Sequence, residues 1–341
     1  MKDDSREEDT NIHRTGIAWK SVLASALGYT FVAIFLAYCI YYLNTHRQEL
    51  SFISKGSLPE LGIAACLVLA SLFTNTFQLR LFFSHFGLSL RFIELIALTM
   101  SMCLGNLVLP MRGGTAIMAV YLKSVHGLNI GAFAVIYAGV GLLMVLVNTG
   151  LALFGLAILY IQLGFFHLPL TLFLAVIFML CAYLSVFPPP ISWKRKGFLK
   201  PILDAINAWY RLTLHRTLLI KLTIWFTLGP VLVMGAFYFI YKAFAAPLPW
   251  SAVLITSSLG NLANLAPIVP GSLGIYDAVT IQVPQIFGLD TARSITAALL
   301  YRLLMFLWCL GLGIPGLIYL FTVRRSRSSK KHQVEHNVET G

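Results

Sequence analysis

The sequence predicts an all-α polytopic membrane protein with about six spanning helices and two broken re-entrant hairpins, arranged as two inverted repeats. The first supporting observation is composition. Of the 341 residues, 58% are hydrophobic and 11% are charged, and the mean hydropathy is +0.81. Charged residues make up roughly a quarter of a soluble globular domain. The other two observations are long uncharged apolar runs and two proline-glycine breaks, at residues 110–114 and 270–277.

Six uncharged apolar runs are long enough to cross the hydrocarbon core, which takes roughly 17 to 25 helical residues. They cover residues 22–43, 61–79, 130–161, 168–187, 222–241 and 303–323. The first run exceeds the apolar region of a signal peptide and no small-residue cleavage site follows it, so we expect a retained anchor. We also expect polar tails at 1–20 and 324–341, and a basic amphipathic segment at 188–216 along the cytoplasmic surface.

Two further apolar stretches, residues 92–128 and 250–288, are each interrupted near the middle by proline and glycine. Their legs are short, since residues 96–110 would rise only about 22 Å as a helix, against roughly 30 Å of hydrocarbon. Irregular backbone at membrane depth occurs where it is buried in protein or lines a cavity. We therefore predict two re-entrant hairpins whose breaks face a polar cavity, as in many transporters.

Self-comparison of the sequence indicates a duplication. The matching segments are 104–107 with 259–262 (LGNL), 127–128 with 288–289 (GL), and 142–144 with 303–305 (LLM). We divide the membrane part into a first repeat at 21–167 and a second at 168–323, each with the order span, span, hairpin, span. The first repeat starts inside and the second starts outside, so the two hairpins are expected to enter from opposite faces.

The basic residues indicate the orientation in the membrane. The formal charge is +12, and the positive residues gather in the loop that contains Lys194 and Arg195 and in the tail that follows Arg324. By the positive-inside rule we expect both to be cytoplasmic, with both termini on the inner side of the cell inner (plasma) membrane. These clusters flank membrane helices and lack an aromatic stacking platform, so we expect no nucleic-acid partner.

Arg112 lies inside the first break and is followed by Gly113 and Gly114. A guanidinium offers several donors to a phosphate, and neighbouring glycines allow close backbone approach. We predict that these three residues contact a lipid headgroup. The alternative is that Arg112 reaches an interface from the hairpin tip and only fixes its depth.

Asp277 ends the second break, and Arg302 lies within the apolar run of the last span. An ionisable side chain at this depth is costly without a partner. Asp277 has three open roles: pairing with Arg302, serving as a proton site that drives exchange, or contacting a cationic headgroup. We include both residues among the candidate substrate-binding residues. Glu94, near the end of the first hairpin, is expected to be an interfacial anchor.

Asn106 and Asn261 occupy matching positions before the two breaks. Their side-chain amides can satisfy backbone groups that an interrupted helix leaves without partners, so we predict a local supporting role. The predicted hinges share the ability to bend or fix the backbone, and are Pro110, Pro270, Gly271 and Gly274.

The sequence contains no recognisable catalytic signature. The motifs GxxxxGK[ST], GxSxG and HExxH are missing, and the five cysteines are scattered singly through apolar runs. We therefore expect no enzyme activity, no metal site and no cofactor. Transport driven by ATP hydrolysis within this chain is excluded.

Three motifs, PMRGG at 110–114, PGSLGIYD at 270–277 and YRLL at 301–304, together resemble the lysylphosphatidylglycerol synthase transmembrane-region family. Members resemble the flippase half of the multiple peptide resistance factor, which moves aminoacylated phosphatidylglycerol between leaflets. The resemblance covers most of the membrane part and implies lipid translocation. The sequence carries no soluble aminoacyl-transferase domain, so lipid synthesis by this chain is not expected.

The resemblance also implies residue roles. It places Arg112 on the arginine of P-x-R-x-G-E, Asp277 on the acidic end of P-G-G-L-G-x-x-E, and Arg302 on the arginine after the second hairpin. The sequence departs from the family at Thr115, Ser272 and Gly141, where a glutamate, a glycine and often an arginine are expected. The missing glutamate calls recognition of a cationic headgroup into question.

The leading hypothesis is flippase-like translocation of a membrane phospholipid, such as an aminoacyl-phosphatidylglycerol, or of a related glycolipid. The two halves would rock about the breaks. The alternative is a non-transporting membrane partner that presents lipid to a separate glycosyltransferase or lipid-modifying enzyme, docked on residues 198–216. A carrier of ions or small solutes is a third hypothesis.

Overall fold

The computed structural model describes residues 41, 57–85, 87–109, 112–164, 166–186, 215–246, 248–265, 272 and 274–339. Within these residues the chain forms nine helices and no strand. The predicted all-α fold is therefore confirmed. The predicted first span at 22–43, the tail at 1–20 and the amphipathic segment at 188–216 lie wholly or almost wholly outside the described residues.

Five of the described helices are long and apolar enough to cross a membrane. They are α2 (Leu58–His85), α5 (Ile130–Leu163), α6 (Leu168–Val186), α8 (Arg216–Ala243) and α11 (Thr291–Glu339). Each contains a predicted run or agrees with it to within a residue. Helix α11 continues through the segment predicted as a tail, because residues 317–339 contain no glycine or proline that would end it.

At each of the two predicted hairpins the structure contains a pair of helices. The first consists of α3 (Phe92–Val108) and α4 (Gly113–His126), and the second of α9 (Trp250–Ala263) and α10 (Ile275–Ile286). The helices contact each other within each pair, and the interruptions fall at the predicted breaks. The first legs, with 17 and 14 residues, are only about 25 Å and 21 Å long.

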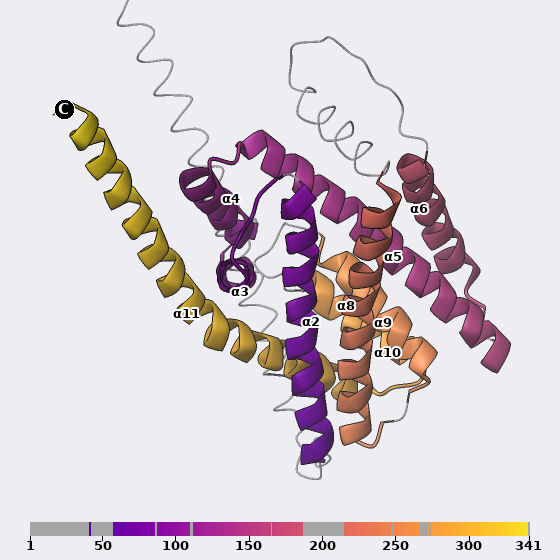
Figure 1. Cartoon of the computed structure of the whole chain (residues 1–341). Helices are drawn as coiled ribbons and strands as arrows, with labels where there is room; N and C mark the ends of the chain where they lie inside the picture. Colours follow the sequence, from indigo (N-terminus) through magenta and orange to yellow (C-terminus); the bar gives the residue numbers. More distant parts are fainter. Residues whose placement is uncertain are drawn as a thin grey trace, which may run out of the picture.

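Helices α2 and α8 form an antiparallel pair and lie side by side in Figure 1. At one end the rings of His85 and His215 lie 4.8 Å apart, and at the other end Lys242 lies 3.8 Å from Glu60. The end of α2 and the start of α8 therefore lie on the same side of the bundle. This agrees with the predicted path of the chain through the membrane.

The first leg of each hairpin contacts the last helix of the opposite half, since α3 packs on α11 and α9 packs on α5. Both contacts use a glycine. A Cβ added to Gly316 would lie 2.9 Å from the carbonyl oxygen of Ala97 on α3, and one added to Gly155 would lie 3.2 Å from that of Ser251 on α9. Gly155 and Gly316 match in the register of the sequence repeat.

The connections after the two hairpins are also alike. Helices α4 and α10 are followed by Gly127 and Gly288, whose φ angles are 69° and 88°. The side chains of Asn129 and Asp290 then each accept a hydrogen bond of 2.8 Å from a backbone N–H at the start of the next helix. A glycine with a left-handed backbone commonly ends a helix, and an asparagine or aspartate side chain commonly caps the start of the next one.

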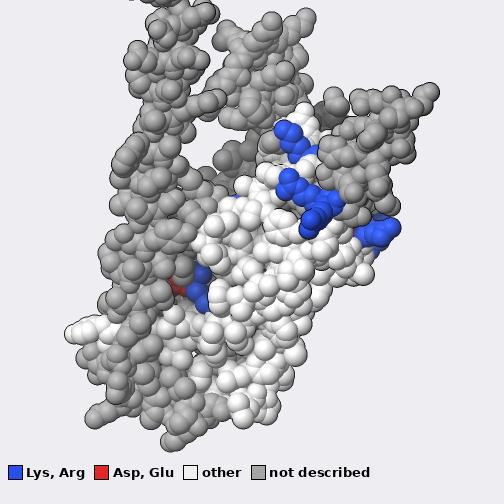
Figure 2. Space-filling view, turned by 90° about the vertical axis from the view of Figure 1, so that its left-hand side faces the viewer, with Lys and Arg blue, Asp and Glu red and all other residues white. Residues whose placement is uncertain are grey.

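The outer surface of the bundle is apolar. Helix α6 is the most exposed of the described spans, and its large exposed side chains are Leu168, Leu172, Phe173, Val176, Met179, Leu180 and Tyr183. In Figure 2, most of the Lys and Arg side chains of the visible face gather toward one end, and the rest of its described surface carries little charge. This distribution is the one expected of helices whose outer faces contact lipid.

Candidate functional site

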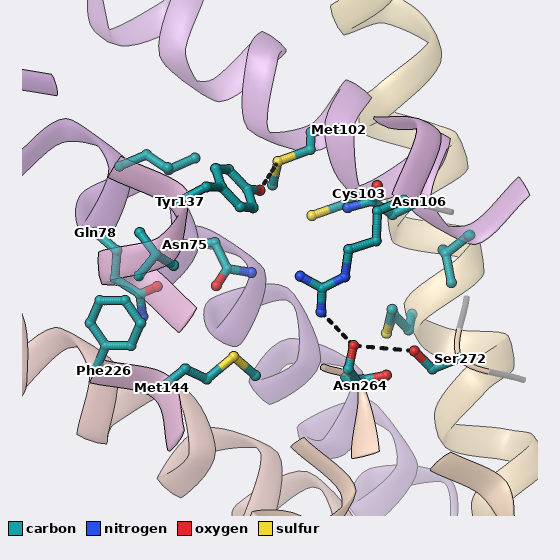
Figure 3. A pocket seen from close by; sticks show the side chains of 15 residues that line it. Asn75, Gln78, Met102, Cys103, Asn106, Tyr137, Met144, Phe226, Asn264 and Ser272 are labelled. Carbon is teal, nitrogen blue, oxygen red and sulfur yellow. Dashed lines mark hydrogen bonds between the residues drawn. The ribbon is translucent and has the colours of Figure 1, made fainter. Parts of the chain in front are cut away.

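The two breaks meet at the carbonyl oxygen of Asn264, which follows α9. Arg112 Nη2 donates to this oxygen at 2.5 Å, and Ser272 Oγ donates to it at 3.2 Å (Figure 3). Arg112 and Ser272 both have left-handed backbones, with φ of 56° and 52°. This conformation is uncommon for residues other than glycine, and such strain concentrates at functional sites. The breaks therefore form one site.

Asp277 and Arg302 form an ion pair between α10 and α11, through Oδ1 and Nε. Asp277 is 1% exposed, and its Oδ2 accepts the backbone N–H of Gly274 at 2.9 Å. Arg302 also donates from Nη2 to the carbonyl oxygen of Ser272 at 3.4 Å and lies 4.9 Å from the centre of the Tyr276 ring. Of the three open roles of Asp277, pairing with Arg302 is thus the one that the structure contains.

The corresponding position of the first hairpin is occupied by an uncharged residue. Thr115 is the third residue of α4, as Asp277 is the third residue of α10. The backbone N–H of Thr115 donates to Oδ1 of Asn106 at 3.0 Å, so the asparagine caps the helix across the break. This agrees with the supporting role predicted for Asn106. Asn261 lines a cavity and has no side-chain hydrogen bond to the described residues.

Each of the four carboxylates whose surroundings are described has a basic partner. These pairs are Glu60 with Lys242, Glu94 with His126, Asp277 with Arg302, and Asp290 with Arg293. Arg112 takes part in none of them, and no described acidic side chain is left over for it. The undescribed residues next to the two breaks, at 110–111, 266–271 and 273, include no acid either. Arg112 therefore brings a positive charge to the site.

Two adjoining cavities lie at this site, between α2, α3, α5, α8 and the two breaks. Their volumes are about 220 Å³ and 170 Å³, and both are lined by Asn75, Gln78 and Asn264. Arg112 and Asn106 line the larger cavity, and Asn106 is labelled in Figure 3. Asp277, Arg302, Gly113 and Gly114 are not among the lining residues of either cavity, so their predicted contact with a substrate stays a prediction.

Several polar residues of the cavities were missed in the sequence. They come from α2, α5 and the second break, and are Asn75, Gln78, Tyr137, Asn148, Asn264 and Ser272. A signal was available, because Asn75 and Gln78 are amides three residues apart inside a run predicted to span the membrane. Residues at that spacing share one face of a helix, and a polar face in a spanning helix indicates a cavity or a helix contact.

The glycines after Arg112 have a packing role in the structure. A Cβ added to Gly114 would lie 2.0 Å from the carbonyl oxygen of Met102 and 2.6 Å from the backbone nitrogen of Asn106. Gly114 therefore lets α4 contact α3 closely. In the second break Gly274 has φ 88° before α10, a conformation that favours glycine, and its role as a hinge stays a prediction. The other predicted hinges, Pro110, Pro270 and Gly271, lie outside the described residues.

Glu94, which was predicted to be an interfacial anchor near a hairpin end, is buried inside the first hairpin. It is 2% exposed, and Oε1 accepts a hydrogen bond from the Tyr121 hydroxyl and contacts Nε2 of His126, both at 2.7 Å. The two partners lie on α4, opposite the start of α3. The carboxylate thus connects the start of α3 to the last part of α4. A buried carboxylate is costly unless it has such partners.

These features define an integral membrane protein with a polar, positively charged cavity where two interrupted helix pairs meet. The family model described as "Lysylphosphatidylglycerol synthase TM region" matches residues 21–313. The chain belongs to this family, as the motifs at the two breaks predicted. Among curated proteins, no relative is found.

Proposed function

We propose that this protein translocates a membrane phospholipid or glycolipid between leaflets, in a flippase-like manner. The family match and the spanning helices support a role in membrane lipid chemistry. The observation that carries the proposal is Arg112: it lines a cavity between the two breaks, and no described carboxylate pairs with it. A guanidinium in this position suits a phosphate group.

The surroundings of Arg112 suit a lipid rather than a free solute. Val108 and Leu109, at the end of α3, are 50% and 37% exposed, and Ile117 and Val120 on α4 are also exposed. These apolar side chains flank the residue that would hold the headgroup. Acyl chains would remain in the bilayer beside them, while the headgroup occupies the cavity.

The matched contacts of the two halves support alternating access as the mechanism. Helix α3 packs on α11 at Gly316, and helix α9 packs on α5 at Gly155. The first leg of each hairpin thus contacts the opposite half in the same way. Such a pattern is expected of inverted repeats, in which one half rocks against the other about a fixed central site. We propose that the breaks are re-entrant and that both termini are cytoplasmic, in the inner (plasma) membrane.

Reconstituted vesicles test the proposal. Purified protein would be placed in vesicles that contain trace acyl-labelled phosphatidylglycerol, and the fraction of label reached by an impermeant quencher would be followed. We expect transfer above that of empty vesicles and a loss of about ten-fold or more for Arg112→Ala, because a charge-assisted hydrogen bond contributes about 1.5–3 kcal/mol.

Arg324→Ala is the matched control, since Arg324 is exposed beyond the predicted last span. It should transfer lipid as the unaltered protein does. Equal rates for both variants and the unaltered protein would exclude a role of Arg112. No transfer by pure protein, together with co-purification of a lipid-modifying enzyme, would instead support the non-transporting partner.

A further inference from the structure

We propose that the cavity selects an anionic headgroup that carries hydroxyl groups and no positive charge, and that it rejects a cationic, aminoacylated one. This inference rests on the proposed function, since it names the class of lipid that the same site would take. The inference is drawn from the chemistry of the lining residues, from their unused hydrogen-bonding atoms and from the balance of charge at the breaks.

The polar residues that line the two cavities are neutral hydrogen-bonding groups and one cation, and they lie beside apolar side chains such as those of Met144, Phe226 and Met305. Among the polar lining residues carboxamides are the most numerous, from Asn75, Gln78, Asn106, Asn148, Asn261 and Asn264. Among the described residues that line the two cavities there is no carboxylate. An amide side chain both donates and accepts, which is what a hydroxyl group requires of its partner. A phosphate beside Arg112 and hydroxyls beside the amides would use both kinds of group.

Some of these amides have atoms to spare. Oδ1 of Asn148 is buried and has no hydrogen-bond partner within the described structure, while its Nδ2 donates to Met144 at 2.8 Å. The side chain of Asn75 likewise makes no hydrogen bond to any described residue. Buried polar atoms of native proteins nearly always have partners. Asn148 lines the smaller cavity, so its oxygen is a hydrogen-bond acceptor without a partner next to the space that a ligand would fill.

The charge balance disfavours a cationic headgroup. An ammonium group in the cavity would lie with Arg112 and would find no carboxylate to pair with. Asp277 is the nearest acid in sequence to the second break, but Arg302 and the backbone of Gly274 already occupy its two oxygens. In the first hairpin the corresponding residue is the neutral Thr115. Like charges that are buried together repel more strongly than they do in water, which disfavours a cationic ligand beside Arg112.

The test compares four acyl-labelled lipids in the same vesicles: phosphatidylglycerol, phosphatidic acid, lysyl-phosphatidylglycerol and phosphatidylethanolamine. We expect phosphatidylglycerol to be transferred about ten-fold faster than lysyl-phosphatidylglycerol, because like charges repel. Phosphatidic acid should be slower than phosphatidylglycerol because its headgroup lacks the glycerol hydroxyls. Equal transfer of lysyl-phosphatidylglycerol and phosphatidylglycerol would overturn the inference and leave lipid translocation standing.

A binding measurement separates this inference from the proposed function. Native mass spectrometry of the purified protein would record which of the same four lipids it retains. If no lipid is transferred, translocation is wrong, yet preferential retention of phosphatidylglycerol would still support the selectivity. Retention of the lysyl lipid as strong as that of phosphatidylglycerol would overturn the selectivity, whatever the outcome of the transfer assay.

Asn75→Asp places a carboxylate among the lining residues with almost no change in shape. It should lower the rate for phosphatidylglycerol and raise the rate for the lysyl lipid relative to it. Asn129→Asp is the matched control: Asn129 caps the start of α5, and aspartate serves equally well there. The comparison of lipids on the unaltered protein remains decisive if Asn75→Asp does not fold.

Discussion

The two hairpins share an architecture but handle charge in opposite ways. In the second hairpin Asp277, at the start of α10, is buried against Arg302, so that break is electrically neutral. In the first hairpin a threonine stands in the same place of α4, Asn106 caps the helix, and no described carboxylate pairs with Arg112. Two similar helix pairs therefore differ in their charges: in one break the carboxylate and the guanidinium pair with each other, and in the other a guanidinium lines a cavity.

The buried ion pair gives the largest expected effect on stability. Asp277→Ala leaves the guanidinium of Arg302 buried without its carboxylate and removes a contact at the start of α10. Breaking a buried pair in this way costs roughly 3–5 kcal/mol. Thermal unfolding in detergent should show a large loss of stability.

A second variant keeps this prediction testable. Asp277→Ala combined with Arg302→Met should recover much of the loss, since no charge is then left alone. Arg112→Ala should unfold close to the unaltered protein. If Arg112→Ala were as destabilising as Asp277→Ala, the contrast between the hairpins would be wrong.

Helix packing in the first hairpin gives the next largest effect. Gly114→Ala places a methyl group 2.0 Å from the carbonyl oxygen of Met102, so α3 and α4 must separate. Overpacking of this kind costs about 1–3 kcal/mol. Gly141→Ala is the control, because a Cβ there meets nothing within 4 Å. The melting temperature of Gly114→Ala should be lower than that of Gly141→Ala. Equal values would contradict the close contact of α3 and α4.

The cap across the first break gives a smaller effect. Asn106→Ala removes the acceptor of the Thr115 N–H, and loss of a helix cap costs about 1 kcal/mol. The unfolding temperature should fall slightly, and Asn106→Asp should retain it because a carboxylate also accepts this hydrogen bond. A fall as large as that of Gly114→Ala would show that Asn106 does more than cap α4.

The smallest effect on stability is expected when the charge of the second hairpin is copied into the first. Thr115→Glu puts an acid in the first turn of α4, where the helix dipole stabilises it by about 0.3–1 kcal/mol. The new carboxylate also brings a negative charge to the helix whose N-cap is Arg112. Stability should change little, but transfer of phosphatidylglycerol should slow. Unchanged transfer would mean that the lipid headgroup does not interact with the charge of Arg112.

The spans and the breaks could be predicted from the sequence because they depend on local properties. Hydrophobicity over a window of residues fixed the five described spans, and proline with glycine marked both interruptions. A segment that crosses lipid must form the hydrogen bonds of its backbone within its own helix. Its position can therefore be read from the residues of that segment alone. The predicted ion pair was one of three options for Asp277, because sequence spacing does not say which side chains meet.

The partners of the polar residues could not be predicted in this way. The place of Glu94 near a hairpin end did not reveal that it is buried against Tyr121 and His126 on the opposite leg. Asn75 on α2 was missed as a cavity residue because nothing local distinguishes it from an amide that only packs between helices. The roles of these residues depend on contacts between segments far apart in the chain.

The sequence by itself determined the membrane class, the positions of the described spans and breaks, and the presence of a charge at each break. Only the tertiary structure decided which charge is neutralised and which one faces the cavity. The reason is that the cost of a buried charge depends on the groups within a few ångströms of it. For Arg302 that group is Asp277, and for Arg112 it is a backbone carbonyl beside an amide-lined cavity.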